Sequence, residues 1–237
     1  MPKDIVIKNN LDIINIQIAI FFKDIENRPD IIGNNLNSKL NNYFNDIPTI
    51  LPNPESLPIS IPFVIYSKDN KKETLQFSRD RCIFICNKEI EMQWNNFIEK
   101  FKSIANNIID LIDFSISRIG IIINSVYFID NPDEYTIKNL MSGFKLKTLK
   151  GIKSSPLETI TFSSNSKGTF QGKSINNLIS ISTGAYLIDN RENKAVRYSI
   201  DINTDIKENN LDKNYVSNFI NTKLKLFSQK EFEEVFK

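Results

Sequence analysis

The chain has 237 residues, a formal net charge of +2, 41% hydrophobic and 24% charged residues, and no histidine. These proportions are those of a folded globular protein and argue against a disordered chain. Because histidine is absent, a His-based catalytic triad, a His-ligated zinc site and an imidazole proton shuttle are all excluded. The small net charge provides no global field that would attract nucleic acid or an anionic membrane.

The first 130 residues predict the element order β-α-β-β-α-β. Alternating isoleucines predict the first strand, and a stripe of apolar residues with a period of 3.6 predicts each helix. Two strand-like arms that flank a polar turn predict a hairpin. We expect strands at 11–23, 63–68, 74–87 and 114–129, and helices at 29–45 and 91–111.

The connection between the first helix and the hairpin is rich in proline. Each proline lacks a backbone donor and restricts φ, so this stretch is neither a helix nor a central strand. We expect an extended surface connection. A polyproline ligand for an SH3-like domain is the alternative, but no Pro-x-x-Pro with a flanking arginine occurs. The prolines are Pro48, Pro52, Pro54, Pro58 and Pro62.

Residues 131–237 predict a second α+β half, packed with residues 1–130 as one compact unit. Turn-forming residues separate short segments of strand-like composition. We therefore expect an α+β fold with a largely antiparallel sheet and helices on one face. The expected elements are a helix at 133–144, a basic loop at 145–156, strands at 158–163, 178–188 and 195–203, and helices at 211–227 and 229–236.

The two cysteines, Cys82 and Cys86, fall in one predicted strand. A strand places them on one face about 13 Å apart, too far for a disulfide, and two thiols are too few to bind zinc. Free buried thiols are typical of a reducing compartment, so we expect a cytoplasmic protein. The N-terminus has no signal-peptide features, and no apolar run reaches the roughly 20 residues that span a bilayer.

One segment resembles the end of a phosphate-binding P-loop. Gly172-Lys173-Ser174 matches G-K-[ST], but the position of the first glycine of that motif is occupied by Lys167. The motif also requires a helix after it, and the residues that follow predict a strand. We therefore reject a nucleotide-binding P-loop.

A basic segment runs from residue 145 to residue 173, with Glu158 as its single acid. Phenylalanines are interspersed in it, as in a groove that binds single-stranded nucleic acid with cations and rings. The alternative is a solvated loop. Arg79 and Arg81, which we expect on one strand face, would either add a bidentate anion contact or pair with acids such as Asp113 or Glu99. The candidate lysines are Lys145, Lys147, Lys150, Lys153, Lys167 and Lys173.

A carboxylate-based, metal-dependent hydrolase is a further alternative. Two-metal sites need several acids at one point, whereas these acids show no ordered motif, and roles in turns explain them equally well. We therefore assign no catalytic, cofactor-binding or metal-ligating residue, and we expect no cofactor. The acids in question are Asp130, Asp133, Glu134, Asp201 and Asp205.

Three stretches of the first half are Pro62-Phe-Val-Ile-Tyr-Ser-Lys-Asp69, Leu75-Gln-Phe-Ser-Arg-Asp-Arg81 and Trp94-Asn-Asn-Phe-Ile-Glu-Lys-Phe101. They are similar to an uncharacterised, sporadically distributed bacterial family of roughly this length. Ser117–Asn124 and Ser199–Asn203 resemble later strands of that family. The resemblance implies a bacterial or phage-associated α+β protein and transfers no activity. Sporadic distribution fits a mobile-element, phage-defence or toxin–antitoxin setting.

These observations favour a non-enzymatic protein that binds another protein, or a second copy of itself, through the Pro-rich connection or the C-terminal helices. A nucleic-acid-binding module built on the basic segment and the carboxylate-based hydrolase remain the alternatives. No membrane contact is expected.

Overall fold

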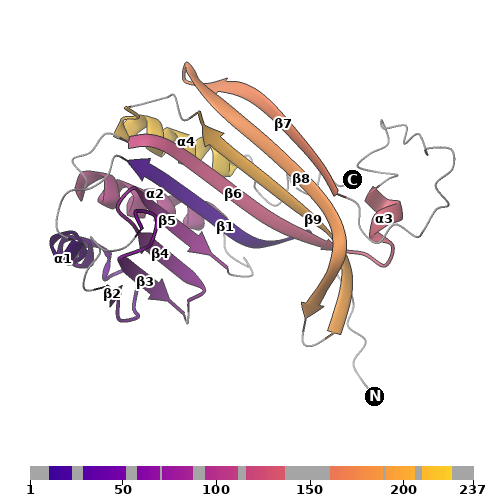
Figure 1. Ribbon diagram of the computed structural model, residues 1–237, viewed down its shortest axis with the longest axis horizontal. Helices are drawn as coiled ribbons and strands as arrows, with labels where there is room; N and C mark the ends of the chain where they lie inside the picture. The colour runs from indigo at the N-terminus through magenta and orange to yellow at the C-terminus, as the bar shows by residue number, and fades with distance from the viewer. Residues whose placement is uncertain are drawn as a thin grey trace.

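The computed structural model describes residues 11–22, 29–51, 58–69, 71–87, 94–111, 116–136, 161–188, 191–205 and 210–225. Within these ranges the chain has an α+β fold, with one nine-stranded sheet in the order β2-β3-β4-β5-β1-β6-β9-β8-β7 (Figure 1). Neighbouring strands are antiparallel throughout. The expected fold class is therefore confirmed.

The strands are β1 (Leu11–Phe22), β2 (Thr49–Ile50), β3 (Val64–Lys68), β4 (Glu73–Phe77), β5 (Arg81–Cys86), β6 (Ile116–Phe128), β7 (Thr161–Phe170), β8 (Lys173–Ile188) and β9 (Arg191–Thr204). The helices are α1 (Pro29–Leu40), α2 (Trp94–Leu111), α3 (Pro132–Tyr135) and α4 (Lys213–Lys225). In the described part of the chain, no helix is long and apolar enough to cross a membrane.

The core lies on one face of the sheet, because successive side chains of a strand point to opposite faces. One register row crosses six neighbouring strands, and every side chain in it is apolar or aromatic and almost completely buried. The two-residue period of the isoleucines in β1 therefore predicted the buried face correctly. The row consists of Tyr66, Leu75, Phe84, Ile18, Ile121 and Ile202.

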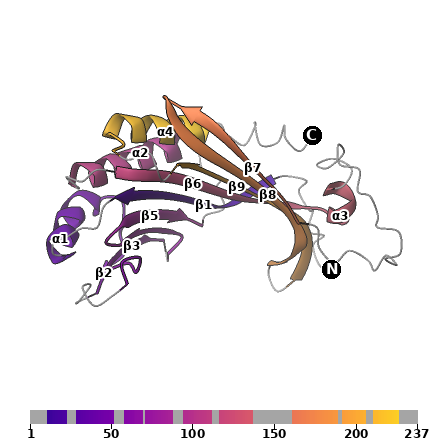
Figure 2. The same ribbon diagram turned by 45° about the horizontal axis from the view of Figure 1, so that its top comes forward.

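The three longer helices cover this buried face, which we call the helix face. The ring of Phe84 contacts Phe101 of α2 at a centroid distance of 4.9 Å. The hydroxyl of Tyr66 donates a 2.8 Å hydrogen bond to the carbonyl of Gly33 in α1. Helices α2 and α4 pack against each other on the same side of the sheet (Figure 2). The described residues place no helix on the opposite face, which we call the open face.

The second arm of the expected hairpin is two strands rather than one. The chain turns between β4 and β5, where the backbone N–H of Ser78 donates to the carbonyl of Arg81 at 2.8 Å. The hydroxyl of Ser78 also donates to the carbonyl of Ser60, at 3.1 Å. Serine and aspartate at 78 and 80 are turn-forming residues, but the flanking apolar runs obscured this signal.

The hairpin of β7 and β8 is longer than expected. The strands continue through the Ser/Asn/Lys stretch and turn at Gln171 and Gly172, where φ is 48° and 78°. Two successive positive φ values are typical of the type I′ turns that connect twisted strands. Most of β7 is exposed, so it has no apolar alternation from which a strand could be predicted.

Both halves of the chain contribute to the sheet, because β6 pairs with β9 from Gly120–Asn203 to Phe128–Ala195. Helix α4 begins two residues later than expected. The side chain of Asp212 accepts a 2.7 Å hydrogen bond from the backbone N–H of Tyr215 and so caps the helix. The expected basic loop at 145–156 and helix at 229–236 lie outside the described residues.

Candidate binding surfaces

The Pro-rich connection (residues 47–51 and 58–62) carries most of the large hydrophobic side chains that are exposed in the described part of the chain. Five large hydrophobic side chains are exposed in the described part of the chain, and four of them are isoleucines of this connection. Ile47 is 90% exposed, Ile50 is 45% exposed, and Ile59 and Ile61 are each 41% exposed. The sequence predicted a surface connection here but not the exposure of its isoleucines, although each of them lies within two residues of a proline.

Backbone hydrogen bonds hold this connection against the sheet. The N–H of Leu51 donates to the carbonyl of Phe63 at 2.8 Å, and the N–H of Ile61 donates to the carbonyl of Pro58 at 2.9 Å. The N–H of Arg79 donates to the carbonyl of Ile59 at 3.2 Å. The isoleucines are therefore presented on an ordered backbone at the β2 edge of the sheet (Figure 1).

The expected placement of Arg79 and Arg81 on one strand face is wrong. Arg79 lies in the turn between β4 and β5, whereas Arg81 is the first residue of β5. Arg81 forms a bidentate pair with Asp80, with N–O distances of 2.8 and 2.7 Å. That side-chain hydrogen bond raises the pKa of Arg81. Arg81 is therefore engaged by its neighbour in sequence. Glu99 pairs with Lys102 instead, and Asp113 lies outside the described residues.

The guanidinium of Arg81 also contacts Phe21, which sequence reasoning did not single out. Phe21 of β1 is in register with Arg81 of β5 on one side and with Arg118 of β6 on the other. Each guanidinium carbon lies 5.2 Å from the ring centroid. This ladder of two cations and one ring stabilises the pairing of three strands. It depends on strand order, which the sequence does not reveal.

Amide side chains form cross-strand networks on the open face. Asn124 of β6 donates to Asn15 of β1 at 3.1 Å. Asn203 donates to Asp201 within β9 at 2.9 Å, and Asn176 of β8 donates to Asn203 at 3.3 Å. These groups satisfy one another, so the asparagines here support strand pairing rather than mark a binding site.

The described members of the basic segment do not form one groove. Lys167 of β7 pairs in register with Asn176 and lies on the open face. Lys173 lies on the helix face, with its ammonium 6.0 Å from the ring centroid of Tyr215 in α4. Phe170 packs against Tyr215 at a centroid distance of 5.5 Å, and Phe162 packs against the core. The lysines at 145, 147, 150 and 153 lie outside the described residues.

The candidate acids are divided between two places. Asp201 pairs in register with Ile122 of β6, which precedes Asp130 by eight residues. In a strand this separation is about 26 Å, far beyond the reach of a shared metal ion. In the described part of the chain, no group of three or more acidic or thiol side chains has metal-binding geometry. Asp130 and Asp201 therefore do not meet at one site, which counts against the alternative of a hydrolase built on these two acids.

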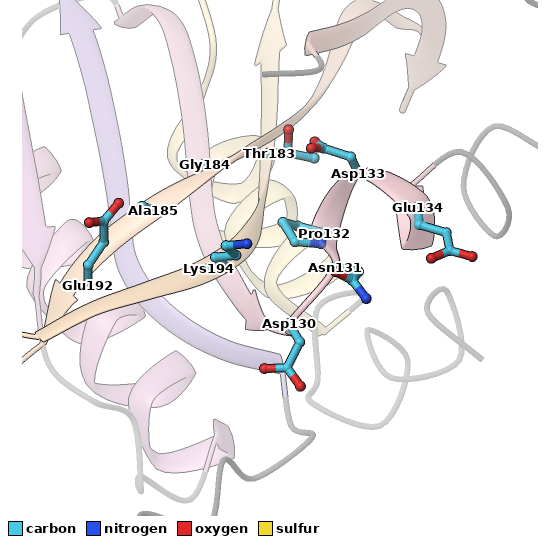
Figure 3. A pocket seen from close by; sticks show the side chains of 10 residues that line it. All are labelled: Asp130, Asn131, Pro132, Asp133, Glu134, Thr183, Gly184, Ala185, Glu192 and Lys194. Carbon is cyan, nitrogen blue, oxygen red and sulfur yellow. The ribbon is translucent and has the colours of Figure 1, made fainter. Parts of the chain in front are cut away.

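Three of these acids do lie together, beside a hollow of about 520 Å³ between α3 and the β8–β9 hairpin. Asp130, Asp133 and Glu134 line it from one side, and Glu192 and Lys194 line it from the other. Figure 3 shows that the carboxylates point in different directions, with Glu134 turned away from Asp133. The hollow is therefore acidic but has no single point at which its carboxylates meet.

The residues that resemble the end of a P-loop form part of the β7–β8 hairpin. Gly172 occupies the β7–β8 turn, and Lys173 and Ser174 begin β8. In the described residues, the turn leads into strands β8 and β9 rather than into a helix whose N-terminus would face a phosphate group.

No protein-family model matches the chain, and no curated protein matches it. Among solved structures, it is similar to the rolling circle replication initiator protein from Geobacillus stearothermophilus. The identity is 10%, the match covers 90% of this chain and 79% of that chain, and the TM-score is 0.28. A likeness at this level carries no argument about function. The resemblance to a bacterial family stays a prediction.

Proposed function

We propose that this protein is a non-enzymatic binding protein, and that its partner is another protein with an apolar surface that docks on the Pro-rich connection. The observation that carries the proposal is the exposure of Ile47, Ile50, Ile59 and Ile61 on one connection. Exposed apolar side chains that gather in one part of a soluble surface are typical of interaction sites.

The connection is suited to binding because its backbone is already ordered. Burial of a fully exposed isoleucine contributes about 1.5–3 kcal/mol before the costs of association are subtracted, and burial of the three isoleucines that are already more than half buried contributes less. Prolines restrict the unbound backbone, and hydrogen bonds to Phe63 and Arg79 hold it in place. Little conformational entropy is therefore lost on binding, which increases the affinity obtained from a small apolar area.

Site-specific photo-crosslinking in the natural host tests the proposal. A photoreactive residue at position 47 or 59 should form a covalent adduct with one and the same protein. Ile59→Asp should abolish the adduct from position 47, because a carboxylate in the contact opposes desolvation. Leu178 is the matched control, since it is 37% exposed but lies in β8, on the open face.

An equal adduct from position 178 would show that the crosslinking is non-specific. An adduct from position 47 that persists in the Ile59→Asp variant would contradict a shared docking surface. Adducts that form only between two copies of the chain would contradict a separate partner protein.

A further inference from the structure

Among the described residues, no strand pairs with the edge of the sheet opposite the Pro-rich connection. β7 is the last strand of the described sheet, and its ten residues all pair with β8 on one side (Figure 1). Seven of the ten side chains are exposed, and the strand contains no proline. The opposite edge strand, β2, has two residues. Long edge strands without proline or a bulge are templates for pairing with another strand.

The sequence of β7 is nearly symmetric about Ser166. Phe162 and Phe170 lie four residues before and after it, and Ser163 and Thr169 lie three residues before and after it. The strand carries a single charge, on Lys167. A strand with this symmetry presents matching side chains to an antiparallel copy of itself.

From this symmetry and exposure, we propose that β7 pairs antiparallel with β7 of a second copy of this chain, with the twofold axis at Ser166. The two nine-stranded sheets then form one continuous sheet, and the helix faces of both copies lie on the same side. Closed twofold pairing of one identical surface is the commonest way in which soluble chains associate.

Geometry selects this register among the alternatives. A twofold axis perpendicular to the sheet places the helix faces of both copies on the same side. Since directly opposite residues of an antiparallel pair point to the same face, one residue of β7 must then lie directly opposite its own copy. An axis at Lys167 would place two ammonium groups opposite each other, which destabilises the pair. An axis at Asn165 would place Phe162 opposite Gly168. The axis at Ser166 places Phe162 opposite Phe170 twice, and aromatic cross-strand pairs are stabilising.

The same axis sets the remaining contacts. Lys167 faces Asn165 of the second copy and is a diagonal neighbour of the other Lys167, about 7–8 Å away. The two lysines repel weakly, so salt should strengthen the association slightly. Phe170 already packs against Tyr215 and Phe219, and the new aromatic pairs extend that cluster across the axis.

Disulfide trapping tests the register. In an antiparallel pair, directly opposite Cα atoms are about 4.5–5.5 Å apart, within the range of a disulfide. Ser166→Cys should therefore oxidise to a covalent dimer. Ser164→Cys is the matched control, because it is exposed on the same face but its two copies would be about 13 Å apart along the strand. Cys82 and Cys86 are buried and do not compete.

A charge exchange tests the association without a covalent bond. Sedimentation velocity should show a dimer for the natural chain and monomers for Ser166→Lys and Ser166→Glu, because each variant places like charges on the axis. An equimolar mixture of the two variants should form a heterodimer. A monomeric natural chain, equal oxidation of the two cysteine variants, or a mixture that stays monomeric would overturn the proposal.

This inference goes beyond the proposed function, since it uses the opposite edge of the sheet. Ile59→Asp should leave the dimer unchanged, and Ser166→Lys should leave the adduct from position 47 unchanged. Failure of one proposal is thus distinguishable from failure of the other.

Discussion

Glu73 of β4 is 1% exposed, and its carboxylate accepts a hydrogen bond from the ammonium of Lys100 in α2. The second carboxylate oxygen of Glu73 is buried with no hydrogen-bond partner. A buried carboxylate loses its solvation and depends on its cation for compensation. This pair therefore connects α2 to the sheet at a defined point of the helix face.

We expect Lys100→Met to lower the free energy of unfolding by about 3–5 kcal/mol, because it leaves an uncompensated buried charge. Urea denaturation at neutral pH measures the change. Lys102→Met on the same helix is the control, since its partner Glu99 is 66% exposed, and there we expect about 0.5 kcal/mol or less. The double variant Glu73→Gln/Lys100→Met should recover part of the loss. Equal effects at 100 and 102 would contradict the assignment.

The free energy of unfolding should decrease as the pH rises above about 8.5. Burial raises the pKa of the Cys82 thiol, so the folded chain keeps a proton that the unfolded chain releases. The unfolded state then binds fewer protons, and the free energy of unfolding decreases by up to about 1.4 kcal/mol per pH unit. Burial also raises the pKa of Tyr66 to about 12, which acts in the same direction only above about pH 10.

Denaturation midpoints at pH 8.0 and 9.5 would check this for the natural chain and for Cys82→Ala. The variant should be less stable at pH 8.0 because of the cavity, and it should lose less stability between the two pH values. An identical loss in both proteins would show that Cys82 is not the titrating group.

Gly172→Ala should destabilise the protein by about 1–2 kcal/mol, because φ is 78° at this turn residue and a Cβ is unfavourable there. Gly184 of β8 is the control. No atom lies within 4 Å of the position that its Cβ would occupy, and its φ is not positive. Gly184→Ala should therefore change stability by about 0.5 kcal/mol or less. Thermal unfolding followed by circular dichroism distinguishes the two variants, and a larger effect at 184 would contradict the strain argument.

Asp212→Ala should cost about 1 kcal/mol through loss of the N-cap of α4, whereas Asp212→Asn should retain most of the stability. Hydrogen exchange at the backbone N–H of Tyr215 reports the cap locally. Unchanged protection of this amide in Asp212→Ala would show that the cap contributes nothing.

The sequence by itself determined the main elements, their order and the buried face. The isoleucines of β1 and the apolar stripe of α2 are periodic, and periodicity is set locally by the geometry of a strand or a helix. The sequence pattern did not reveal the turn at Ser78–Asp80 or the full length of β7. A turn between two apolar runs interrupts no period, and an exposed strand has no period to detect.

Only the tertiary structure decided which side chains meet. Arg81 and Arg118 flank Phe21 because β5 and β6 are both neighbours of β1, and Asp201 is far from Asp130 because of the register of β6 with β9. Exposure of the four isoleucines and of β7 likewise depends on their positions at the two edges of the sheet. Strand order and register result from long-range burial over the whole chain, and no local sequence pattern encodes them.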